Sequence, residues 1–202
     1  MELLGYLVYV AEGNSAYEQV LTASSSADPT VLQHEHVAAD LTPGDTYKFK
    51  VSAINVVGEG EAAQLRTAQP LVGDAVDYVL AADLPEAPPN PPAVESFTET
   101  AISLTLEALD AASNGGAAVT GYLVEIDDGL GAAGGGFRRV HDSLTTELII
   151  SNLVGGRTYS LRYAARNEVY DSGNMFACDA LQWSPIATVL TAVRPSPPVN
   201  LR

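Results

Sequence analysis

Two stretches of the sequence decide the fold: residues 41–47, which read LTPGDTY, and residues 153–159, which read LVGGRTY. In each stretch a leucine and a tyrosine enclose a turn that contains glycine. Apolar and polar residues alternate after each tyrosine, and the apolar positions are Phe49, Val51 and Ala53 in the first copy and Leu161, Tyr163 and Ala165 in the second. A period of two is typical of a strand with one buried face. The chain therefore contains the same turn and strand twice.

The duplication extends outward from these two stretches. Residues 5–8 (GYLV) recur as residues 121–124 (GYLV), and Asn55 and Asn167 end the two strands that follow the tyrosines. A proline-rich segment follows each copy, at residues 85–92 (PEAPPNPP) and 195–198 (PSPP). Prolines stiffen a connector and remove backbone donors from it, so these segments mark domain boundaries. A chain of 202 residues suits two domains of about 100 residues each.

The combination of L-x-x-G-x-x-Y, a strand that ends in Ala-x-Asn, a G-Y-x-V strand and Pro-rich junctions resembles tandem fibronectin type III domains. This resemblance implies an all-β chain of immunoglobulin-like β-sandwiches placed end to end. It also implies a tyrosine corner in each copy, in which the phenol bonds to the backbone just upstream of its strand. The residues of the two corners are Leu41, Tyr47, Leu153 and Tyr159.

The second copy, residues 93–194, is expected to be a complete domain. Its seven strands are predicted at residues 93–98, 101–109, 119–127, 137–140, 147–151, 158–167 and 186–193. The family usually has a core tryptophan in the second strand, whereas this chain has Leu106 at that place. We therefore expect a lighter core there.

The first copy, residues 1–84, lacks sequence for the first two strands of such a domain. Its last strand has two candidates, residues 62–68 and residues 75–81. Residues 85–92 are the predicted linker, and residues 195–202 resemble a linker and the first strand of a further domain. One interpretation is a segment of a longer array. The other is head-to-tail strand addition, in which the end of one molecule completes the first domain of the next; the donated residues would be Pro198, Val199, Asn200 and Leu201.

An enlarged loop precedes the last strand of the second copy, at residues 170–183 (YDSGNMFACDALQW). It contains residue types that are enriched in protein interfaces. The candidate interface residues are Tyr170, Met175, Phe176 and Trp183. In the alternative interpretation, Trp183 packs on its own domain and Phe176 closes the end of the sandwich.

Composition excludes several classes of function. The chain has 25 acidic and 10 basic residues, a net charge of −15, which argues against nucleic acid or an anionic membrane surface as a partner. No apolar run approaches the roughly 18 residues that span a bilayer, so no membrane insertion is predicted. The single cysteine, Cys178, excludes an internal disulfide and a zinc site built from several cysteines.

Neither a metal site nor a catalytic site is predicted. His34 and His36 stand on one side of a strand but lack a third ligand nearby in sequence. The acids at positions 125, 127 and 128 lack the spacing of a calcium loop, and Glu125 is expected to pair with Arg162 across two strands. The glycine-rich residues 129–136 lack the Lys-Ser/Thr of a phosphate loop, and no cofactor is expected. No motif for nucleophilic catalysis is present either.

The sequence thus predicts a non-catalytic structural or adhesive spacer, or a filament-forming module. Expected partners are proteins, either copies of this chain or adjacent domains of the same array. An extracellular or cell-surface location is favoured. The alternatives are a ciliary or cytoskeletal scaffold inside the cell, and an accessory module of a larger enzyme or receptor.

Overall fold

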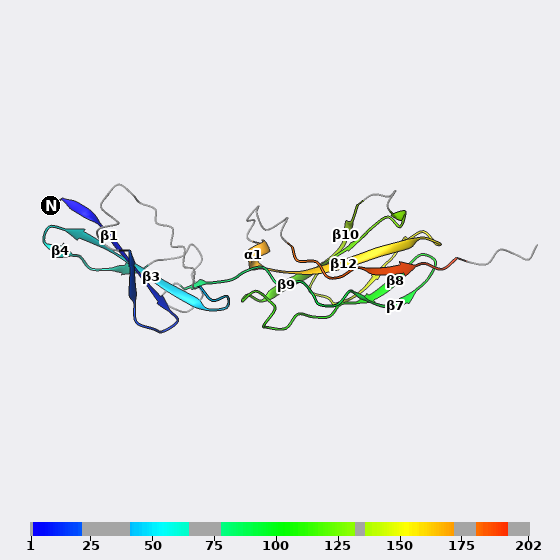
Figure 1. Cartoon of the computed structure of the whole chain (residues 1–202), viewed down its shortest axis with the longest axis horizontal. Helices are drawn as coiled ribbons and strands as arrows, with labels where there is room; N and C mark the ends of the chain where they lie inside the picture. The colour runs from blue at the N-terminus through cyan, green and yellow to red at the C-terminus, as the bar shows by residue number, and fades with distance from the viewer. Residues whose placement is uncertain (1, 22–40, 65–77, 132–135, 172–180, 194–202) are drawn as a thin grey trace, which may run out of the picture. The chain divides into compact units, whose positions relative to one another are not determined.

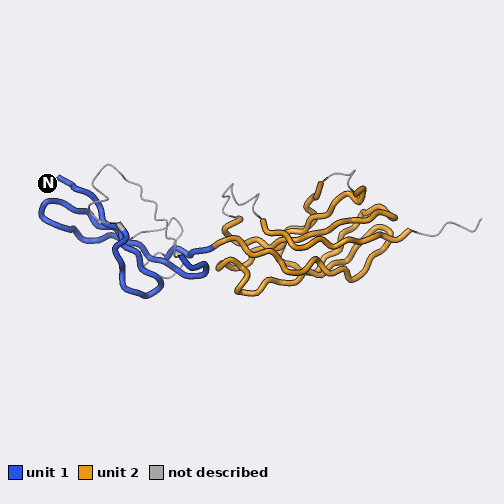
Figure 2. The backbone as a smooth tube through the Cα atoms, in the orientation of Figure 1, with its two compact units in different colours: residues 1–82 blue, residues 83–202 orange. Residues whose placement is uncertain are grey.

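A computed structural model describes residues 2–21, 41–64, 78–131, 136–171 and 181–193 of the chain. The chain divides into two compact units, Met1–Ala82 and Asp83–Arg202 (Figure 2). Almost all regular structure in both units is β-strand; the one described helix, α1 (Glu168–Asp171), has a single turn. None of the described helices is long and apolar enough to cross a membrane.

The described strands of the first unit form one antiparallel sheet (Figure 1). Its strand order is β2 (Glu18–Leu21), β1 (Leu3–Glu12), β3 (Thr46–Asn55) and β4 (Gly58–Glu59). The long central pair, β1 and β3, runs from Leu3 opposite Asn55 to Glu12 opposite Tyr47, with one shift of register between Leu3 and Gly5. These are the two strands that the period-two pattern predicts.

Both candidates for the last strand of the first unit contribute a short pairing to β3. Strand β5 (Ala63–Gln64) lies opposite Lys50 and Val51, and β6 (Val79–Leu80) lies opposite Thr46 and Tyr47. Two further backbone bonds extend the β6 pairing, from Gly44 N–H to Ala81 O and from Ala81 N–H to Asp45 O. The single edge strand of an ordinary sandwich is therefore divided between two segments.

The second unit is a sandwich of two antiparallel sheets (Figure 1). The four-stranded sheet has the order β10 (Arg138–Ser143), β9 (Val119–Ile126), β12 (Thr158–Asn167) and β13 (Ala187–Leu190). The three-stranded sheet has the order β11 (Glu147–Ile150), β8 (Ile102–Thr105) and β7 (Ala93–Phe97). All seven predicted strands of the second copy are present, which confirms the all-β sandwich.

The core of the second unit lies between these two sheets. Thirteen buried residues form it: Ile102, Leu104, Leu106, Tyr122, Val124, Ile126, Ile150, Leu153, Tyr159, Leu161, Tyr163, Ala165 and Val189. Leu106, at the place expected for a tryptophan, is only 3% exposed. The phenol of Tyr163 donates a hydrogen bond to the backbone oxygen of Glu107, which satisfies its one polar atom inside the sandwich.

The matching face of the first unit is less buried. Tyr6, Val10, Phe49 and Val51 are half-buried, although their counterparts in the second unit are fully buried. Val8 is buried on this face, and Leu7 and Ala11 are buried on the opposite face. In β1, therefore, burial does not follow the simple alternation that the sequence suggests.

The residues just before β7 are hydrogen-bonded to the rest of the second unit and partly buried in it. The backbone N–H of Asp83 donates to Gly115 O at 2.8 Å, and the Asp83 carbonyl accepts a hydrogen bond from Asn167 Nδ2 at 2.7 Å. Pro85 and Pro88 are fully buried. Gly115 has a φ of 73°, and a Cβ there would lie 2.2 Å from the Asp83 oxygen. Glycine is therefore required where this segment crosses the loop before β9.

Candidate interaction surface

Both tyrosines of the L-x-x-G-x-x-Y stretches bond to the backbone upstream of their strands. Tyr159 Oη accepts a hydrogen bond from the N–H of Val154 at 2.9 Å, and Tyr47 Oη accepts one from the N–H of Thr42 at 3.1 Å. Both rings are buried, whereas Leu41 is 39% exposed and Leu153 only 5% exposed. These contacts hold the turn before each strand and offer no reactive group.

An aromatic and cationic stack covers the outer face of β12. The guanidinium of Arg162 lies 4.2 Å from the centre of the Phe137 ring and 4.3 Å from the centre of the Trp183 ring. Its Nη2 atom also lies 2.7 Å from Glu125 Oε2, which confirms the predicted cross-strand pair. A cation between two ring faces is attracted by both quadrupoles, so the stack fixes Trp183 on its own sheet.

Trp183 and Tyr170, two of the four candidate interface residues, contact a small apolar cluster of their own domain. The cluster consists of Leu123, Ala164 and Leu181, which are 0%, 0% and 8% exposed. The hydroxyl of Tyr170 also accepts a hydrogen bond from Arg139 Nη2 at 3.2 Å. Trp183 therefore packs on its own domain, as the alternative interpretation of this loop predicts. Met175 and Phe176 lie outside the described residues.

The remaining charged side chains of this face pair with one another or with the backbone. Arg166 Nε lies 2.8 Å from Asp142 Oδ1. Asp127 Oδ1 accepts hydrogen bonds from the N–H groups of Gly129 and Ser160, each at 3.0 Å. The described residues hold no group of three or more metal-ligating side chains, while His34 and His36 lie outside them. The described carboxylates of this face therefore serve the fold.

The outer face of the first unit has its own cation and aromatic cluster. Lys50, at the position of β3 that corresponds to Arg162 of β12, has its Nζ atom 4.6 Å from the ring centres of both Tyr9 and Tyr17. The Tyr9 hydroxyl donates to Glu59 Oε1 at 2.7 Å, and Ser52 Oγ donates to the same oxygen. The bond to Glu59 raises the pKa of Tyr9, and the bond from Ser52 lowers the pKa of Glu59.

Sequence reasoning missed three of these contacts: Phe137 over Arg162, the two tyrosines beside Lys50, and the bond of Asn167 to the segment before β7. One signal was available for the first two, because both strands carry a long cationic side chain at the third residue after the corner tyrosine. The proposed strand-addition residues Pro198, Val199, Asn200 and Leu201 lie outside the described residues.

No protein-family model matches this chain. The chain is 29% identical to titin of Drosophila melanogaster over 158 residues, which is 77% of this chain and 1% of titin.

Two solved structures each align with 94% of the chain at 19% identity. A crystal structure of titin domains has a TM-score of 0.52, with 55% of that chain covered. The FN1–FN3 domains of chicken CNTN1 have a TM-score of 0.48, with 56% covered. The chain thus spans a small part of its curated relative and just over half of these two structures.

Proposed function

The chain is built on the fold of tandem fibronectin type III domains, and we propose that it is a non-catalytic structural module of a longer protein. The observation that carries this proposal is the outer face of the second unit, where Arg162, Glu125, Arg166 and Asp142 are paired with one another or stacked on rings. Ion pairs and ring contacts of this kind stabilise the sandwich, and these four charged side chains are then not available to act on a substrate. The similarity to titin, of which this chain covers 1%, agrees with a place in a long protein.

The adhesive, spacer or filament role is the finer part of this proposal. A spacer needs each domain to fold and to be joined firmly to its neighbour in sequence. The hydrogen bonds of Asp83 and the burial of Pro85 and Pro88 support this role, because they make the start of the second unit part of its folded body. The partners that we propose are adjacent domains of the same array and other copies of this chain.

The first unit is proposed to be completed by strand addition. The residues 195–202 (PSPPVNLR) resemble a proline-rich linker and the beginning of the first strand of a further domain. We propose that residues 198–201 of another copy lie against the half-buried face of the first unit, which carries Tyr6 and Phe49. Within this segment, the apolar residues Val199 and Leu201 would supply the buried side chains.

The solution mass of the chain tests strand addition. We expect light scattering after size exclusion to show head-to-tail oligomers that grow with concentration. The double variant Val199→Lys with Leu201→Lys should stay monomeric, because lysines at these positions cannot be buried. A wild-type chain that is monomeric at every concentration contradicts strand addition.

The spacer role is tested separately, by exchange of domains in the full-length parent protein. Residues 83–202 would be replaced by an unrelated fibronectin type III domain of similar length. We expect the function of the parent protein to survive this exchange. Loss of function, with normal expression and folding, would show that this surface is specifically recognised and would contradict a spacer.

A further inference from the structure

Strand β13 is a four-residue edge strand that carries neither a charge nor a proline of its own. In the described part of the second unit it pairs only with β12. Residues 187–193 (ATVLTAV) contain no charge, no proline and no glycine. The other edges of this sandwich carry charges, with Arg138 and Arg139 in β10, Glu147 in β11 and Glu95 in β7. Charges and prolines on edge strands discourage pairing with other chains, so β13, which has neither, is open to pairing with a further strand.

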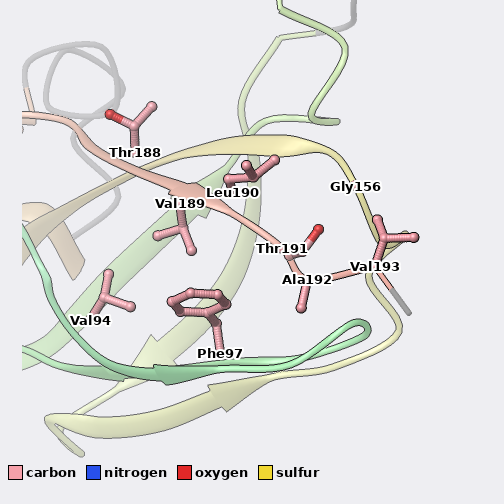
Figure 3. Close-up of a pocket in the computed structure, with 9 residues that line it drawn as sticks. All are labelled: Val94, Phe97, Gly156, Thr188, Val189, Leu190, Thr191, Ala192 and Val193. Carbon is pink, nitrogen blue, oxygen red and sulfur yellow. The ribbon is translucent and has the colours of Figure 1, made fainter. Parts of the chain in front are cut away.

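An apolar groove of about 770 Å³ lies beside this edge, between β13 and β7 (Figure 3). Val94, Phe97 and Val189 point into the space between the two strands (Figure 3). Phe97 is 51% exposed, Leu190 60% and Val193 62%. None of the nine residues that line the groove is charged. Phe97, Leu190 and Val193 therefore leave apolar surface exposed beside the edge of the sheet.

The register of β13 turns free backbone groups toward the outside of the sheet. Val189 lies opposite Tyr159, the N–H of Thr191 donates to Arg157 O, and the carbonyl of Thr191 accepts from the N–H of Gly156. Backbone groups of successive strand residues point to opposite sides in the plane of a sheet. The N–H and C=O groups of Thr188 and Leu190 therefore point away from β12 and are placed to pair with one more strand.

We propose that β13 and this groove bind an extended segment of a partner protein by strand addition. The segment has apolar side chains at alternate positions, which would enter the groove over Val94 and Phe97, and lysine or arginine at its ends. Main-chain hydrogen bonds to Thr188 and Leu190 would hold the segment in place, while the groove would select its side chains.

Charge explains why the occupant is a basic segment of a different protein. Glu95 is exposed on β7, and Glu99 lies beside Gly155 and the Ala192 carbonyl at one end of the groove. The net charge of the chain is −15, so a basic segment is attracted at long range. Strand β13 of a second copy carries no basic side chain to pair with Glu95 and Glu99, which disfavours pairing of β13 with β13 of a second copy.

The test uses a fluorescent peptide, acetyl-Lys-Lys-Val-Thr-Val-Thr-Phe-Thr-Lys-Lys-amide, titrated with the whole chain and followed by anisotropy. We expect saturable binding that weakens as salt is added. Leu190→Lys should weaken binding by about tenfold or more, because it adds a like charge at the centre of the edge. The matched control is Leu144→Lys, since Leu144 is also 60% exposed but does not line the groove. The control should change binding by less than about twofold.

A second variant removes one donor without adding charge. Leu190→Pro eliminates an N–H that points away from β12, so the pairing with β12 is kept. It should also weaken binding by about tenfold. The fluorescence of Trp183, the only tryptophan of the chain, reports whether each variant is folded.

Three results would overturn the proposal. The first is no binding of the peptide, and the second is equal binding by Leu190→Lys and the wild type. The third is a doubling of mass in light scattering that Leu190→Lys abolishes, since that result would assign the groove to a second copy. None of these results bears on strand addition at the first unit, which uses a different face and different residues.

Discussion

The two units carry the same pattern of residues, yet they bury it differently. In the second unit, Tyr122, Val124, Leu161 and Tyr163 are between 0% and 4% exposed, because a three-stranded sheet covers them. In the first unit the described strands form one sheet, and Tyr6, Phe49 and Val51 at the corresponding positions are half-buried. The alternation of a strand therefore specifies which face is apolar, and a second layer is needed before that face becomes a dry core.

The same comparison holds for the outer faces. At corresponding positions Lys50 lies between two tyrosines, and Arg162 lies between a phenylalanine and a tryptophan. Only Arg162 also has a carboxylate at 2.7 Å. A planar guanidinium stacks on rings and pairs with Glu125 at once, whereas an ammonium acts as a point charge. At this position of the strand, Arg162 therefore stabilises the second unit more than Lys50 stabilises the first.

The largest expected effect comes from truncating the corresponding core residues. Leu161→Ala should destabilise the second unit by about 2–5 kcal/mol, because it leaves a cavity at a fully buried site. Phe49→Ala should cost the first unit only about 1–2 kcal/mol, since part of its ring is already exposed. Hydrogen exchange, read separately for β12 and β3, measures both. An equal or larger cost at Phe49 would show that its face is fully covered in solution.

Gly115 of the second unit and Gly13 of the first both have a left-handed backbone, and replacing each by alanine compares the two units. Gly115→Ala should destabilise the second unit by about 3 kcal/mol, because the new methyl displaces Asp83 and breaks its hydrogen bonds. Gly13 has a φ of 52° with no atom within 4 Å of a built Cβ, so Gly13→Ala should cost only about 1 kcal/mol in the first unit. Urea denaturation followed for each unit would measure the two costs. If the two costs are the same, the contact between Asp83 and residue 115 does not add to the destabilisation caused by Gly115→Ala.

Loss of the two cations should have smaller effects. Arg162→Ala is expected to cost about 1–2 kcal/mol, because Glu125 loses its partner and two rings lose their cation. Lys50→Ala should cost about 0.5 kcal/mol, since its ammonium contacts two rings at 4.6 Å and attracts Glu59, which is weaker than the stacked and paired guanidinium of Arg162. Thermal unfolding of both variants provides the measurement, with Arg162→Lys as an intermediate. A larger loss for Lys50→Ala would reverse the proposed ranking.

The smallest expected effect is a titration in the first unit. The bond to Glu59 raises the pKa of Tyr9, so it adds stability that is present below the ordinary ionisation range of tyrosine and is lost as the pH rises through the raised value. The bond from Ser52 lowers the pKa of Glu59, so that contribution is present above the ordinary range of glutamate and is lost as the pH falls through the lowered value.

Glu59→Gln should therefore move the titration of Tyr9 to lower pH. Carbon NMR of the tyrosine Cζ atoms, assigned with Tyr9→Phe, would follow it. An unchanged titration would mean that the Tyr9–Glu59 bond is not kept in solution. The second unit carries Glu125 at the position of Tyr9 and offers no matching titration.

Much of the fold was predictable because strands and turns leave local signals. The seven strands of the second unit lie at their predicted places, although β8 ends at Thr105 and not at residue 109, since period-two patterns and the Gly, Pro and Asn residues between strands are properties of neighbouring residues. The last strand of the first unit was ambiguous for the same reason. Two segments had suitable patterns, and the structure pairs a piece of each with β3.

The surfaces were far less predictable. The stack on β12 joins Phe137, Arg162 and Trp183, which are distant in sequence and come together only when β10, β12 and the segment before β13 are in place. The groove beside β13 depends on how two edge strands from different sheets are spaced. No local pattern reports such a spacing.

The sequence by itself determined the all-β class, the duplication, the tyrosine turns and most strand positions, because these depend on residues within a few positions of one another. Only the tertiary structure decided which apolar faces are covered, where the cations stack and which edge is open. Those properties depend on the distance between whole sheets, and one strand pattern is compatible with a covered face as well as with a half-exposed one. The contrast between Leu161 and Phe49 shows this most directly.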